Sequence, residues 1–558
     1  VAIGFESGFC QQFANATSIG YFAGKTSQRQ NATAIGAAAG TLNQGSESVA
    51  VGHLAGGSGQ GIRSTSIGFE AGRSGQGSGS VAIGTSAGDC LQGSQAVSLG
   101  NEAGKTSQFP RAVAIGPSSG LFQQGSGAVA IGFESAGQLQ GANTVTIGIA
   151  SAAFSQGSGS VAIGGNAGYS NQQTQCVAIG SNSGSTIQGT NSTAIGTNAA
   201  SMRQLQQATA IGSEAAAFHQ SQFATAIGRK AGFSRQGISA TAIGDLAGEC
   251  GQGSGALSIG GEAGQVNQGD TSIAIGDHAG QSDQGSQSVA IGKSAGFENQ
   301  GSQSVAVGVE AGTSTQGIKA TAIGYQAGQS DQQDEALAIG TGAGTCVQAS
   351  SAVAIGKFAG ESTQGSRSVA IGAEAARETQ DPESVAIGIF AGKVTQGSQS
   401  TALGAFAAQV NQGNRSTAIG ALAGYTEQED DAMAIGASAG LSNQGSAAVA
   451  IGFEAGYSNQ FSNAVGIGYQ AGRCNQNNNS VAIGYTAGAS GQGEVATAIG
   501  PGAGRINQSS QAIAIGFGCG FCNQGVASFA AGFGAGASGQ GENATAIGYL
   551  AGNSDQSP

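Results

Sequence analysis

The sequence predicts an all-β fold, a parallel β-solenoid of 35 coils with 16 residues in each coil, and three observations lead to it. A short motif recurs every 16 residues along the 558 residues without insertion or deletion. The core of the motif alternates with period two and is rich in Val, Ile and Thr, which favour strands. Glycine interrupts this core at a fixed position, as expected for a corner between short strands.

The repeat is numbered here from Val1, so that Ile3 stands at position 3 and Gly4 at position 4 of the first coil. Position 4 is Gly and position 12 is Gln in all 35 coils, and positions 16, 2 and 7 are nearly always Ala or Ser. Sixteen residues are too few for a pair of helices, so successive coils must stack as hydrogen-bonded strands. At about 4.8 Å per coil, residues 1–558 are expected to form one continuous shaft of roughly 170 Å.

Charged residues avoid eight positions of the repeat: 16, 1, 2, 3, 4, 7, 8 and 12. An unpaired buried charge is costly, so these positions are predicted to be hidden from water. Positions 1 and 3 point to one side of their strand and positions 16 and 2 to the other, so the strand is uncharged on both sides. The rest of its own coil can shield only one side of the strand from water, so the other side needs something outside the coil to pack against.

We interpret Val or Thr at position 1 and Ile at position 3 as the interior of the coil, and the Ala and Ser residues as a flat face against another chain. The opposite assignment of the two sides satisfies the same pattern. The predicted core ladder contains Ile3, Ile19, Ile83, Ile163 and Ile323. The predicted inter-chain face contains Ala82, Ala162 and Ala322. At Phe529 the side chain at position 1 is larger than usual, and at Ala531 the side chain at position 3 is smaller than usual. This compensation in size indicates that the two side chains share one packed space.

The invariant glutamine predicts a ladder of amides inside a corner, where it bonds from coil to coil and satisfies backbone groups. Its members include Gln12, Gln28, Gln44, Gln300 and Gln556. The invariant glycine, as at Gly4, Gly84 and Gly324, is expected to hold a positive φ or to lie where a side chain would collide with a neighbour.

The core motif resembles the SVAIG motif of YadA-like head repeats, which belong to trimeric autotransporter adhesins, and also segments of phage and large-virus fibre proteins. Residues 80–84 and 160–164 read Ser-Val-Ala-Ile-Gly, and residues 322–328 carry a related motif. The resemblance implies a left-handed β-roll, a homotrimer, a place outside the cell on a cell or virion surface, and adhesion or a fibrous role without catalysis. The family's repeat is slightly shorter and usually lacks the fixed glutamine.

Composition and motifs argue against several other functions. The net charge of −12 disfavours nucleic acid as a partner, and no apolar run is long enough to span a bilayer. Carboxylates are scattered over variable positions, the three histidines are far apart, and a single Cys-x-x-Cys lacks the second pair that zinc needs. We therefore expect no enzyme, no catalytic residue, no cofactor and no metal ion.

The leading hypothesis is a structural fibre or filament shaft, a rigid surface spacer whose main partner is itself. A solenoid end is a sticky strand edge, so flanking regions or end-to-end assembly into longer fibres are also expected. The alternative is an adhesin or other binding module that uses the exposed faces for attachment to a host cell or matrix, with an unknown surface ligand. An ice-binding face is disfavoured, because the positions interpreted as outward are irregular.

Overall fold

The computed structural model describes residues 1–555 and confirms an all-β parallel solenoid, with no helix among these residues. The chain divides into two compact units, Val1–Ser282 and Asp283–Pro558, which are described separately. None of the described residues belongs to a helix long and apolar enough to cross a membrane.

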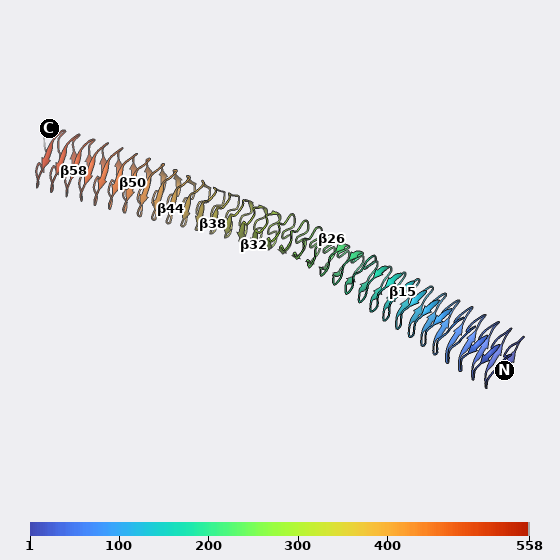
Figure 1. The fold of residues 1–558 in the computed structure, drawn as a ribbon. Helices are drawn as coiled ribbons and strands as arrows, with labels where there is room; N and C mark the ends of the chain where they lie inside the picture. The colour runs from blue at the N-terminus through green and yellow to red at the C-terminus, as the bar shows by residue number, and fades with distance from the viewer. Residues whose placement is uncertain (556–558) are drawn as a thin grey trace. The chain divides into compact units, whose positions relative to one another are not determined.

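In both units, each coil contributes one strand of two or three residues from positions 1–3 of the repeat. These strands run from β1 (Ala2–Ile3) to β29 (Ile273–Ile275) in the first unit and from β30 (Val289–Ile291) to β61 (Thr545–Ile547) in the second. Paired strands are parallel, and their partners stand 16 residues apart, as in Ile323 with Ile339. Figure 1 shows this stacking within the second unit, for example at β32 (Val305–Val307), β38 (Val353–Ile355) and β44 (Thr401–Leu403).

A second strand in most coils covers positions 10–12 and ends at the invariant glutamine. In the first unit these strands form three groups, β3 (Thr26–Gln28) with β5 (Leu42–Gln44), β9 (Cys90–Gln92) to β19 (Ser170–Gln172), and β22 (Met202–Gln204) to β26 (Ser234–Gln236). In the second unit they form one sheet from β31 (Glu298–Gln300) to β59 (Cys522–Gln524). Most coils are therefore flattened loops with two short strands.

The two sides of the first strand are reversed relative to our interpretation. Ala82, Ala162 and Ala322 are fully buried inside the coil, so they are not an inter-chain face. The isoleucines stack in the predicted register, but they point outward: the side chains of Ile83 and Ile323 are each 38% exposed. The predicted core ladder of Ile3, Ile19, Ile83, Ile163 and Ile323 is therefore an outer ladder, at which Ile3 and Ile19 are exposed and Ile163 is partly buried.

The physical reason for the reversal is the width of the coil. The side chain of the position-12 glutamine lies inside and reaches the opposite strand, where Gln28 Nε2 donates to the Thr17 carbonyl oxygen at 2.7 Å. With this amide in place, only small side chains fit opposite it, and positions 2, 7 and 16 provide them, mostly as Ala or Ser with an occasional Thr or Cys such as Thr146 and Cys176. Branched side chains at positions 1 and 3 must therefore face outward.

The corner glycine has both of the properties that the sequence offers as alternatives. Gly4, Gly84 and Gly324 have φ values of 129°, 129° and 133°. A Cβ atom on Gly324 would lie 2.6 Å from the carbonyl oxygen of Gly340 in the next coil. Glycine is required here because the backbones of successive coils meet at this corner.

Candidate interaction face

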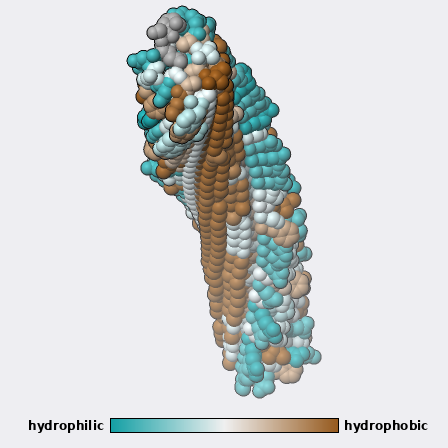
Figure 2. Space-filling view, turned by 90° about the vertical axis from the view of Figure 1, so that its left-hand side faces the viewer, coloured by the Kyte–Doolittle hydropathy of each residue, from teal (hydrophilic) through white to brown (hydrophobic). Residues whose placement is uncertain are grey.

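Within each unit, positions 1 and 3 of successive coils form an outward surface, which we call the Val/Thr–Ile face. Position 1 carries mostly Val or Thr and is generally partly buried, while position 3 carries mostly Ile and is partly buried or exposed. Each side chain is covered above and below by its equivalents in the neighbouring coils, as Ile83 is by Ile67 and Leu99. The remaining exposure is directed away from the coil, and Figure 2 shows it as a brown stripe that runs across many coils.

The face is free of charge along its whole described length, because no Asp, Glu, Lys or Arg occupies positions 1 to 3 in any coil. Soluble monomers rarely expose apolar patches larger than a few hundred Å², and larger ones mark interaction sites. A flat row of Ile and Val that repeats coil after coil exceeds this size. The Val/Thr–Ile face is therefore the strongest candidate for a contact surface on the molecule.

Ion pairs lie outside this face, and many of them join neighbouring coils. Arg229 Nη2 lies 2.6 Å from Asp245 Oδ2, and Arg415 Nε lies 2.7 Å from Asp431 Oδ1. Arg73 Nε lies 2.9 Å from Asp89 Oδ1, where burial raises the pKa of the Asp89 carboxyl and the Arg73 guanidinium opposes that rise. The exposed pairs Arg229–Asp245 and Arg415–Asp431 contribute little to stability individually, but they keep charge on the other faces of the coil.

Exposed aromatic rings stack at position 5, beyond the corner glycine that ends each first strand, and two of these columns contain three rings. Phe453, Tyr469 and Tyr485 are stacked, with ring centroids 5.3 and 5.1 Å apart. Phe517, Phe533 and Tyr549 form the second column, with centroids 4.9 and 5.3 Å apart. The stacking of these rings follows directly from the 16-residue register, because residues at the same position of the repeat lie beside each other.

The glutamine ladder lies inside the coil, and the structure confirms its two expected functions. Gln12 Nε2 donates to Gln28 Oε1 at 3.0 Å, and Gln300 Nε2 donates to Gln316 Oε1 at 3.0 Å. The same nitrogen of Gln300 also donates to the Val289 carbonyl oxygen at 2.9 Å. Gln12 is only partly buried, whereas Gln28, Gln44 and Gln300 are buried. Gln556 lies outside the described residues.

The ladder is interrupted at a few coils. Gln44 Nε2 donates to the Thr33 carbonyl oxygen at 2.7 Å, but Gln44 Oε1 is buried without a hydrogen-bond partner. Gln60, Gln140 and Gln204 likewise have an unpartnered Oε1 atom. The glutamine Nε2 atom thus makes two kinds of hydrogen bond, one to the position-1 carbonyl oxygen and one to the next glutamine. The bond to the carbonyl oxygen is the more regular of the two. Sequence reasoning predicted that the glutamine satisfies backbone groups, but it did not identify the position-1 carbonyl oxygen as the acceptor.

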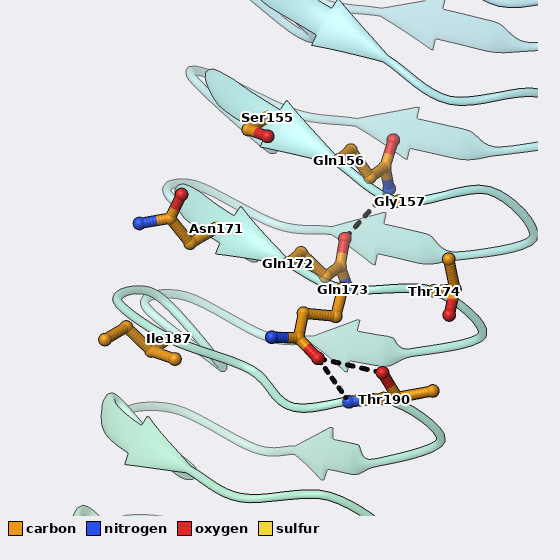
Figure 3. A pocket seen from close by; sticks show the side chains of 9 residues that line it. All are labelled: Ser155, Gln156, Gly157, Asn171, Gln172, Gln173, Thr174, Ile187 and Thr190. Carbon is orange, nitrogen blue, oxygen red and sulfur yellow. Dashed lines mark hydrogen bonds between the residues drawn. The ribbon is translucent and has the colours of Figure 1, made fainter.

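The surface also carries shallow hollows beside the second strand of some coils. In the hollow of Figure 3, Gln173 Oε1 accepts hydrogen bonds from the backbone nitrogen of Thr190 at 3.1 Å and from its hydroxyl at 2.8 Å. Gln156 and Gln172 of the interior ladder form its floor, and none of its lining residues is ionisable. Within residues 1–555, no cluster of three or more His, Cys, Asp and Glu side chains could hold a metal ion.

The cysteines are all free thiols, as the sequence predicts for most of them. Cys10 and Cys346 are exposed, whereas Cys176 and Cys519 are buried. Burial raises the pKa of the Cys176 and Cys519 thiols. Comparison of the chain with protein-family models and with curated proteins finds no match.

Proposed function

We propose that this protein is a structural shaft that associates side by side with copies of itself through the Val/Thr–Ile face. The observation that carries the proposal is the uncharged, outward apolar surface at positions 1 and 3 in each unit. Burial of such a surface against a partner is favourable, by about 25 cal/mol per Å² of apolar area removed from water. A second copy is the favoured partner because it repeats with the same 16-residue period and therefore matches row for row.

The size of the face is sufficient for a specific contact. The second unit contains about 17 coils, so at about 4.8 Å per coil and about 10 Å across three strand residues its share of the face covers roughly 800 Å². A standard protein interface buries about 800 Å² on each partner. One unit alone therefore offers enough surface for a stable contact between copies.

The resemblance of the repeat to YadA-like head repeats supports a trimer as the assembled form and display outside the cell, on a cell or virion surface. It also supports a non-catalytic role as a spacer. The ladder of buried amides and the parallel register favour a stiff element, because neighbouring coils are hydrogen-bonded through the backbone and, in many coils, also through the glutamine side chains.

An adhesin is the second candidate, and the two exposed aromatic columns favour it. Rings such as Tyr469 and Tyr485 supply apolar contact area at a small cost in conformational entropy. Replacing both tyrosines with Ser should reduce attachment of the purified protein to a cell or matrix layer if these rings bind a ligand. If the protein is only a shaft that displays other elements, the unaltered protein and the double Ser variant should attach equally well.

The test of self-association is the mass of the assembly in solution, measured by analytical ultracentrifugation on two matched variants. Ile323→Lys places a charge on the Val/Thr–Ile face, whereas Ile318→Lys makes the same change at an exposed isoleucine at position 14. We expect several copies for the unaltered protein and for Ile318→Lys, and smaller assemblies for Ile323→Lys. A monodisperse monomer of the unaltered protein, or equal masses for the two variants, would overturn the proposal.

A further inference from the structure

A strictly periodic face leaves the alignment of two copies undefined. We define a row as the position-1 and position-3 residues of one coil. Most rows pair Val or Thr with Ile, so a slip of one coil, about 4.8 Å, replaces each row by a nearly identical one. Strands with little variation in their side chains specify their register weakly. A defined assembly therefore needs a row that differs from the others.

One row differs at both of its positions. In β60 (Phe529–Ala531), Phe529 replaces the usual Val or Thr, and Ala531 replaces the usual Ile. Ala530 between them is fully buried, so Phe529 and Ala531 both belong to the outward face, and both are partly buried. The shared space of these two side chains is thus outside the coil, which corrects our expectation of an interior compensation.

The neighbouring rows carry the usual large isoleucine at position 3 and no aromatic ring at position 1. Ile515 and Ile547 flank Ala531 in the sheet, so this alanine leaves a depression in the isoleucine column. Ile513 and Thr545 flank Phe529, so its ring is the largest projection in the position-1 column. One row therefore carries a projection and a depression at the same height.

Rotational symmetry brings these two features together. When copies are related by a rotation axis parallel to the stack, every row meets the same row of the next copy, because the rotation does not change height. A two-fold axis also reverses the strand direction across the contact, so that position 1 of one copy faces position 3 of its neighbour. A three-fold axis turns the strand by about 120° instead, and in that ring the position-1 edge of each copy lies next to the position-3 edge of the adjacent copy.

We propose that Phe529 of each copy packs into the depression at Ala531 of the adjacent copy and thereby fixes the register of the assembly. The proposal rests on the self-association proposed above. After a slip of one coil, the ring would meet an isoleucine, Ile515 or Ile547, and the depression would face a smaller side chain. The first mismatch overpacks the contact and the second leaves a cavity, and both are unfavourable.

The test measures register and mass on the same full-length proteins. A spin label is attached to a ketone-bearing residue that replaces exposed Glu542, so that the native cysteines are not labelled. The double variant F529V/A531I gives this row the commonest pair of the repeat and is expected to fold. Thr545→Val alters the next row of the same face and serves as the control.

We expect one inter-copy label distance for the unaltered row and for Thr545→Val. For F529V/A531I we expect an unchanged mass, with additional longer distances that correspond to slips of whole coils. A single unchanged distance in F529V/A531I, or several distances with the unaltered row, would overturn the register proposal while self-association stands. Monomers of the unaltered protein would overturn the self-association beneath it.

Discussion

Leu99 lies directly beside Ile83 in the parallel register of β8 (Val81–Ile83) and β10 (Val97–Leu99), one coil apart. This pair is the simplest expression of the 16-residue period, because the two residues at position 3 come from adjacent coils and point outward together. The same relationship places every invariant residue beside its equivalents. Changes at one position of the repeat should therefore have similar consequences in most coils.

An enlarged side chain inside the coil should destabilise the fold more than the same side chain outside. Ala322 is fully buried, and Ala322→Leu is expected to cost about 1–3 kcal/mol through overpacking. The matched change Ile323→Leu, on the exposed position next to it, should cost much less. Urea unfolding together with hydrogen exchange of the adjacent coils measures both effects, and equal losses would contradict the assignment of the interior.

Loss of one ladder glutamine should be costly because it leaves buried acceptors without donors. In Gln300→Leu, the Val289 carbonyl oxygen and Gln316 Oε1 each lose a hydrogen bond, with a penalty of about 1–3 kcal/mol for each buried group left unpaired. Gln303→Leu removes an exposed amide and should change stability by less than about 0.5 kcal/mol. Similar unfolding midpoints for the two variants would show that the interior amide is dispensable.

The corner glycine should tolerate no side chain. Gly324→Ala combines a φ of 133° with a Cβ atom 2.6 Å from the Gly340 carbonyl oxygen, so a loss of about 1–3 kcal/mol is expected. A Cβ atom on Gly165 would meet nothing within 4 Å, and this glycine has no positive φ, so Gly165→Ala should be neutral or slightly stabilising. Thermal unfolding of the two variants provides the comparison, and a tolerant Gly324 would argue against close approach of the coils.

Thiol reactivity should follow burial. The pKa of the Cys176 and Cys519 thiols is raised by burial, so less thiolate is present at pH 8 than for an ordinary cysteine, and alkylation is slow in the folded protein. Exposed Cys10 and Cys346 should react first. Raising the pH increases the thiolate fraction at Cys176 and Cys519 only as it approaches their raised pKa values. Peptide mass spectrometry after timed iodoacetamide treatment checks the order in which the four cysteines are alkylated. In denaturant, the four should react at similar rates.

The period, the parallel register, the corner glycine and the interior glutamine could all be predicted from the sequence. The direction in which the first strand faces could not, because the criterion was absence of charge, and both sides of the strand lack charge. Variation in size was the better indicator. Met433 and Phe529 are accommodated at position 1 because the space outside the coil is open, whereas position 2 is confined to small residues by the glutamine opposite.

The face through which we propose that copies associate also could not be assigned from the pattern of one chain. Ala82 is small and uncharged, and these properties suit a narrow interior as well as a contact with another chain. What distinguishes the two is the amide of position 12, whose reach across the coil depends on three-dimensional distances that the repeat does not state.

The glutamine ladder also bears on how the chain reaches its native state during synthesis. Where the ladder bonds from coil to coil, Nε2 donates toward the coil with higher residue numbers, as Gln300 does toward Gln316, so such a finished coil presents a donor to the segment that leaves the ribosome next. Nearly all coil-to-coil partners stand about 16 residues apart, and such local contacts favour rapid folding. Growth can then proceed one coil at a time, with every completed coil acting as the template for its successor.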